Sequence, residues 1–200
     1  TTNIIESENV FRSKSEMEQA EDRLRQLPIV KAVGHSNGTP SSGTNNSSGE
    51  YEGKSLSFQQ MQVDSAAFHI FGLEIKTDNG VANSSGGWFL NELAFKQMEL
   101  PEDAVSFKWG EDATPILGVI KDFQLWDISR ENSPVMFRFR DPKSGWWPWS
   151  YVIEVQGDLV KAYEEVRNVF EEVSGVPFEG RFIDQGIQEH FESQIRLAKI

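Results

Sequence analysis

The fold is decided by residues 151–183, YVIEVQGDLVKAYEEVRNVFEEVSGVPFEGRFI. Apolar and polar residues alternate at the start of this stretch, which predicts a strand. Asp158 can cap a helix, and Gly175 with Pro177 ends it. Phe178–Ile183 then returns as a second strand. The apolar stripe that the helix would bury consists of Leu159, Ala162, Tyr163, Val166, Phe170 and Val173.

The N-terminal end of the chain carries the same kind of pattern. Thr2–Ile5 fits a short strand, and Ser13 with Glu16 has the form of a capping box that opens a helix. Pro28 stops the helical spacing, and residues 29–33 are apolar enough for a buried strand. Both ends of the chain therefore supply strands and helices.

Because the two ends resemble each other, we expect residues 1–40 and 150–200 to form one discontinuous subdomain around a common sheet. Asp184 opens a last amphipathic helix, and no stop signal follows it before Ile200. We therefore expect the natural chain to continue beyond this helix.

Residues 41–149 are predicted to form an inserted α+β subdomain. Ile116–Ile120 is apolar on both faces, as a central strand is, whereas Val135–Phe139 alternates and should have one wet face. Gly38–Gly49 and Thr77–Gly87 are rich in polar and small residues and are predicted to be loops. The other expected elements are a strand at 56–60, a helix capped by Asp64, a strand at 88–90 and a helix capped by Asn91. The predicted class is α+β, with a mixed sheet and helices formed by both chain ends.

The composition excludes several classes of protein. The formal net charge of −12 repels phosphate backbones, and no local basic patch offsets it, so we expect no nucleic-acid binding. The chain has no cysteine, which excludes disulfides, thiolate chemistry and Cys-based zinc sites. Its longest apolar stretch, Pro115–Ile120, is far shorter than the roughly 18–20 residues of a membrane-spanning helix.

No pattern of catalytic or metal-binding residues stands out. The three histidines, His35, His69 and His190, lie outside any recognised ligand spacing. His190 and the carboxylates around it, at 184–192, have the pattern of a solvated acidic helix face. No nucleophile elbow or phosphate-binding loop occurs. We expect no enzymatic activity, no cofactor and no metal.

The most unusual local feature is a cluster of three tryptophans, Trp146, Trp147 and Trp149. So short a segment cannot point three indoles into one small core, and Pro148 keeps it out of a central strand. At least one indole should be exposed. The cluster is either a partner-binding patch or a seal between the two subdomains, and the sequence favours neither.

Several short motifs occur in an order that is typical of one family. They are Phe71–Ile75, Leu90–Glu92, Ile116–Phe123, Asn132–Pro134 and Phe178–Asp184, followed by Phe191, Glu192 and Arg196. Together they resemble the MacB-like periplasmic core domain of FtsX-family ABC transporter permeases, in the form found in Bacteroidetes. The resemblance covers nearly the whole chain.

This resemblance implies a porter subdomain formed by both chain ends, with an inserted sabre subdomain. It implies a place at the periplasmic face of the bacterial inner membrane and partners on both sides of it. These are a cytoplasmic ATPase subunit, reached through transmembrane helices, a second permease protomer, and a periplasmic protein or substrate. Two segments depart from the family pattern, Lys76–Asn79 and Met98–Pro101, which puts the conformation and contacts of both in doubt.

The function expected from this resemblance is non-catalytic. The domain would transmit ATP-driven motion of the transmembrane helices to periplasmic partners or substrate. The alternative is an extracytoplasmic sensor that binds a small ligand or peptide between its subdomains. A deep pocket with convergent polar groups would favour the sensor.

Overall fold

The structure, a computed structural model, describes residues 2–38, 45–122 and 133–199. The chain divides into two compact units. Unit 1 comprises Thr1–Ser36 and Trp147–Ile200, and unit 2 comprises Asn37–Trp146.

The sheet of unit 1 combines strands from both ends of the chain. Its order is β11, β1, β10, β2, and every pair in it is antiparallel. Ile5 lies opposite Ile153 on one side and Phe182 on the other, so the first strand is held between two C-terminal strands. The strands are β1 (Thr2–Glu8), β2 (Val30–Ser36), β10 (Ser150–Gln156) and β11 (Arg181–Phe182).

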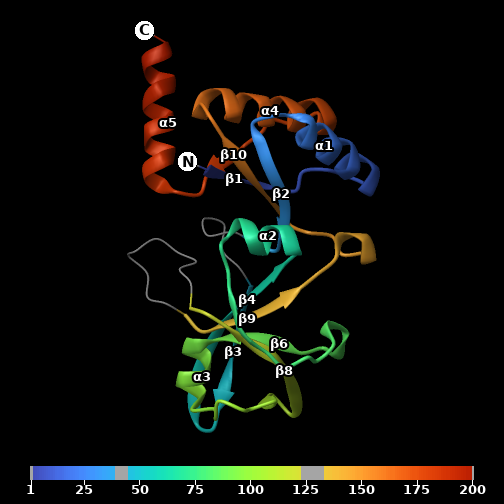
Figure 1. Cartoon of the computed structure of the whole chain (residues 1–200), viewed down its shortest axis with the longest axis vertical. Helices are drawn as coiled ribbons and strands as arrows, with labels where there is room; N and C mark the ends of the chain where they lie inside the picture. The colour runs from blue at the N-terminus through green and yellow to red at the C-terminus, as the bar shows by residue number, and fades with distance from the viewer. Residues whose placement is uncertain (1, 39–44, 123–132, 200) are drawn as a thin grey trace. The chain divides into compact units, whose positions relative to one another are not determined.

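Three capped helices complete unit 1, namely α1 (Lys14–Gln26), α4 (Leu159–Ser174) and α5 (Gln185–Ala198). Each begins where the sequence predicts, because Ser13, Asp158 and Asp184 accept a hydrogen bond from a backbone N–H of the first turn. Helices α1 and α4 contact each other and pack on one face of the sheet, while α5 packs against α4 and β11 (Figure 1).

Large aromatic side chains fill the core between the helices and the sheet of unit 1. Phe170 of α4 contacts Phe11, Tyr151 and Phe178 with ring centroids 4.9–5.5 Å apart. Phe191 fixes α5 by stacking 4.6 Å from Tyr163. A few rings from α4 thus join most elements of this unit.

The sheet of unit 2 mixes parallel and antiparallel pairs in the order β4, β9, β6, β8, β5. The pairs β4–β9 and β6–β8 are parallel, and β6–β9 and β5–β8 are antiparallel. Two further strands lie outside this order, β3 paired with β4 and β7 paired with β8. The strands are β3 (Asn45–Tyr51), β4 (Lys54–Val63), β5 (Ile75–Asp78), β6 (Trp88–Asn91), β7 (Ser106–Trp109), β8 (Asp112–Ile120) and β9 (Val135–Phe139).

Two short helices flank this second sheet, α2 (Ser65–Ile70) and α3 (Glu92–Met98). Asp64 and Asn91 cap them, as the sequence predicts. The residues on the α3 side form a cluster around Leu90, Ile116 and Met136. On the α2 side, Phe68 packs against the rings of β9.

The structure corrects several sequence predictions. Asn45–Tyr51, most of which was expected in the loop at 38–49, is a strand, because its backbone pairs with β4 along seven positions although its side chains are polar. Residues 39–44 of that expected loop lie outside the described residues. The loop expected at 77–87 begins as strand β5, which runs to Asp78. Strand β9 is internal, so Met136 on its expected wet face is buried.

The predicted fold class is confirmed. The chain is α+β, and its strand pairs include both parallel and antiparallel ones. Both chain ends contribute strands to one sheet. Within the described residues no helix is long and apolar enough to cross a bilayer.

Candidate functional site

The three tryptophans of the cluster have different surroundings. Trp146 is buried, with 5% of its surface exposed, while Trp147 and Trp149 are 40% and 47% exposed. The expectation that at least one indole is exposed is therefore confirmed. Trp146 is the last residue of unit 2, and Trp147 and Trp149 belong to unit 1.

The exposed pair is held in place by the turn after β1. The Asn9 side chain donates to the Pro148 carbonyl at 3.0 Å, and the Asn9 backbone N–H donates to the Trp149 carbonyl at 2.7 Å. The Oδ1 of the same side chain accepts from the Phe11 N–H, so Asn9 connects two loops through its Nδ2 and Oδ1. Because Pro148 also has a fixed φ, the two indoles are presented on a rigid backbone.

A cation lies over one of these rings. The Lys14 ammonium is 5.8 Å from the centre of Trp147, within the range of a cation–π contact. Exposed aromatic side chains on a rigid backbone are typical of the residues that dominate protein interfaces. The segment is thus suited to docking.

A polar cluster that the sequence did not predict is buried in unit 1. Glu21 of α1 lies 3.0 Å from His35 Nε2 of β2 and accepts a hydrogen bond from the Tyr151 hydroxyl of β10 at 3.2 Å. All three residues are buried, with at most 8% of their surface exposed, so no substrate can reach them. The cluster joins α1 to two strands, and we assign it a structural role.

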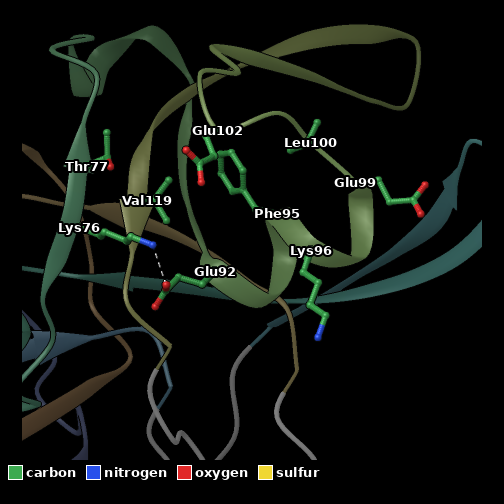
Figure 2. A pocket seen from close by; sticks show the side chains of 9 residues that line it. All are labelled: Lys76, Thr77, Glu92, Phe95, Lys96, Glu99, Leu100, Glu102 and Val119. Atoms are coloured by element: carbon green, nitrogen blue, oxygen red, sulfur yellow. Dashed lines mark hydrogen bonds and ion pairs between the residues drawn. The ribbon is translucent and has the colours of Figure 1, made fainter.

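Unit 2 contains a cavity of about 560 Å³ beside α3, shown in Figure 2. This volume lies within the range of small-ligand sites. One wall comes from the edge strand β5 and from β8, and the other comes from α3 and the residues after it. The lining residues are Lys76, Thr77, Glu92, Phe95, Lys96, Glu99, Leu100, Glu102 and Val119.

An ion pair connects the two walls of this cavity. Lys76 of β5 donates to Glu92 of α3 at 3.0 Å, and the Asp122 backbone N–H donates to the same carboxylate at 3.2 Å. These two hydrogen bonds, the Lys76 bond above all, hold the pKa of Glu92 below its ordinary value. Asp122 in turn accepts from the Leu93 N–H. The first turn of α3 is thereby tied to both neighbouring strands.

Only an indirect sign of this cavity is present in the sequence. Its walls come from three elements that are distant in sequence, so no spacing motif could show them together. However, Lys76 and Thr77 lie in one of the two segments that depart from the family pattern, and Glu99 and Leu100 lie in the other. The structure places both departures around one cavity.

The residues weighed as metal ligands are not brought together. Among the residues that the structure describes, no group of three His, Cys, Asp or Glu side chains could hold a metal ion. His69 is exposed, and its Nδ1 lies 2.7 Å from the Ser65 carbonyl of its own helix.

Comparisons with known proteins bear on the fold. No family model and no curated protein matches the sequence. Among solved structures, the periplasmic region of MacB from Actinobacillus actinomycetemcomitans matches with a TM-score of 0.59. That match covers 98% of this chain and 92% of the MacB region, at 13% sequence identity. The chain has the fold of the MacB periplasmic region.

Two further structures share this MacB-like fold. The extracellular domain of the ABC-type transporter YknZ from Gram-positive bacteria matches with a TM-score of 0.57 at 11% identity, covering 92% of this chain and all of that one. A domain assigned to a permease from Porphyromonas gingivalis matches with a TM-score of 0.52 at 12% identity, covering 90% and 88%. The predicted resemblance to MacB-like periplasmic domains is confirmed at the level of the fold.

Proposed function

We propose that this chain is the extracytoplasmic domain of an ABC transporter permease, and that it transmits motion without catalysing a reaction. The observation that carries the proposal is the agreement with the MacB periplasmic region over 98% of the chain and 92% of that region. The YknZ domain, which also comes from an ABC-type transporter, supports the same assignment.

The connection between the chain ends supports a mechanical role. Strand β1 pairs with β10 along seven positions and with β11 along two, and the Ile183 N–H donates to the Ile4 carbonyl at 2.9 Å. Helix α5 begins directly after that contact. Displacement of either end therefore acts on one hydrogen-bonded sheet and cannot be absorbed by two separate linkers.

In this proposal, unit 1 corresponds to the porter subdomain and unit 2 to the sabre subdomain. The domain lies at the periplasmic face of the bacterial inner membrane, and transmembrane helices outside this sequence connect it to a cytoplasmic ATPase. A second permease protomer completes the transporter. ATP binds to the ATPase subunit, so the domain itself needs no cofactor.

For the periplasmic partner we propose the exposed indoles of Trp147 and Trp149 as the contact surface. Their exposure and their rigid backbone, held by Asn9, favour docking. Trp146 belonged to the same predicted patch, but a partner could reach its buried ring only after a local rearrangement.

The assignment is tested on the natural full-length protein expressed in its own cells. We expect the protein in the membrane fraction and an ATPase subunit to co-purify with it. A full-length protein that is released in soluble form, or that carries no ATPase partner, would contradict the transporter assignment.

The partner surface is tested by placing a photo-crosslinking residue at Trp147 or Trp149 in the same cells. Val105, a 64% exposed apolar residue of unit 2, is the matched control position. We expect one discrete crosslinked protein from positions 147 and 149 and none from position 105. Equal products from all three positions would show that the indoles are ordinary surface.

A further inference from the structure

We infer that the cavity of unit 2 is a binding site for a peptide that carries a Lys or Arg side chain next to apolar residues. All nine lining residues belong to unit 2, so the site needs nothing from unit 1. It would serve a transporter or any other extracytoplasmic protein, and its test does not depend on the proposed function.

The middle of the cavity combines one carboxylate with apolar surface. Figure 2 shows the Glu102 carboxylate directed toward the space beside the Phe95 ring, with Val119 on the opposite wall. Phe95 and Val119 are partly buried, so each leaves part of its apolar surface accessible to a ligand. A cation on the Phe95 ring next to Glu102 would gain a cation–π contact and an ion pair together.

The other charges of the cavity are already engaged or point elsewhere. Lys76 is paired with Glu92 at 3.0 Å. Glu99 extends away from the cavity and pairs with Lys54 at 3.3 Å, and Lys96 also extends outward (Figure 2). Within the described part of the chain, Glu102 makes no ion pair or hydrogen bond. Its charge therefore remains available for a ligand, and the net charge of −12 adds a general attraction for cations.

The shape of the cavity favours a side chain over an added strand. Strand β5 is an edge strand of four residues whose register shifts between Ile75 and Thr77, and such short, irregular edges resist pairing with another chain. A volume of about 560 Å³ holds a small ligand, or roughly one long side chain with its neighbour. The Thr77 hydroxyl on the β5 wall offers a hydrogen bond to the peptide backbone.

The test uses the 200-residue chain and the blocked tripeptide acetyl-Phe-Arg-Phe-amide, followed by amide chemical shifts. We expect saturable shifts at Thr77, Phe95 and Val119. The same tripeptide with citrulline in place of Arg keeps the shape without the charge and should bind at least tenfold more weakly. Absence of shifts at these residues up to millimolar peptide, or equal binding of the citrulline peptide, would overturn the inference.

Two isosteric variants locate the charge that is responsible. Glu102→Gln should weaken binding of the Arg peptide about tenfold or more. Glu111→Gln removes the same charge from an exposed carboxylate of unit 2 that does not line the cavity, and it should change the affinity less than twofold. Both side chains are exposed, so both variants should fold. Equal losses in the two variants would indicate attraction to overall charge and would contradict a specific site, as would shifts confined to Trp147 and Trp149.

Discussion

The two units of this chain differ in how helices cover their sheets and in which elements supply their cores. Unit 1 lays two long helices on one face of a purely antiparallel sheet, and its core depends on rings that α4 supplies. Unit 2 places helices of six and seven residues on opposite faces of a sheet with parallel pairs, and the sheet itself supplies most of its core. The difference shows where each unit is vulnerable: unit 1 at a helix, and unit 2 at the contacts between its strands.

The largest expected effect separates the two cores. Phe170→Ala removes a fully buried ring that contacts three other aromatic residues, and it should lower the free energy of unfolding by about 3–5 kcal/mol. Hydrogen exchange should accelerate mainly in α1, α4, β1 and β10. The matched variant Phe137→Ala, also fully buried, should accelerate exchange mainly in unit 2. Equal acceleration in both units from either variant would show that the chain unfolds as one body.

An intermediate effect is expected from a glycine in the sheet of unit 2. A Cβ at Gly118 would lie 2.0 Å from the Thr77 carbonyl oxygen and 2.8 Å from the Phe89 ring. The registers of β5 and β6 against β8 both shift near this residue, so three strands depend on the close approach. Gly118→Ala should destabilise the protein by about 1–3 kcal/mol or more, measured by denaturant unfolding.

Gly110→Ala is the control for that substitution. Gly110 has φ +80°, and an added Cβ would meet no atom within 4 Å, so alanine there costs only the left-handed conformation, about 1–2 kcal/mol. Chemical shift changes should stay local for Gly110→Ala and extend through β5, β6 and β8 for Gly118→Ala. If the changes caused by Gly118→Ala also stay local, the sheet of unit 2 does not depend on the close approach of its strands at this glycine.

The smallest effect concerns the charges that tie α3 to its neighbouring strands. Lys76→Met removes the main cause of the lowered Glu92 pKa, so this pKa should rise toward its ordinary value, as measured by carboxyl NMR titration. A carboxylate with a lowered pKa stabilises the fold above its unfolded-state pKa and loses this contribution as pH falls through the folded-state value. The variant should therefore be less stable than the parent chain at neutral pH, and the two stabilities should converge in acid.

Lys96→Met provides the comparison on the same helix. The Lys96 side chain extends outward, so its removal should leave the Glu92 pKa unchanged (Figure 2). Because both Lys76 and Glu92 are exposed by more than a third, the stability change at neutral pH should be on the order of 0.5 kcal/mol. An unchanged Glu92 pKa in Lys76→Met would show that Lys76 does not stabilise the charged form of Glu92.

Local chemistry made the helices predictable from sequence. Each of the five α-helices that the structure describes begins after a side chain that accepts from its first turn, and this signal lies within four residues. The five predicted caps are Ser13, Asp64, Asn91, Asp158 and Asp184, and each makes the expected hydrogen bond.

Strands whose stability comes from a distant partner were less predictable. Asn45–Tyr51 has the composition of a loop, yet it pairs with β4 and Ser47 accepts from the Trp109 indole at 3.0 Å. The strand expected over Phe178–Ile183 is reduced to Arg181–Phe182, because only these residues lie opposite β1. Of the candidate sites, the tryptophan cluster was visible in sequence, whereas the cavity depends on Lys76 and Glu92 meeting across two elements.

The end of β2 and the start of β10 have a consequence for how such a chain could arise. Ser36 lies opposite Ser150 in adjacent antiparallel strands, at a separation that an ordinary two-residue hairpin spans. Topologically, everything between them occupies the position of a hairpin turn. An ancestral four-stranded module could therefore have acquired the whole of unit 2 through one lengthened turn, without any change in its own strand order.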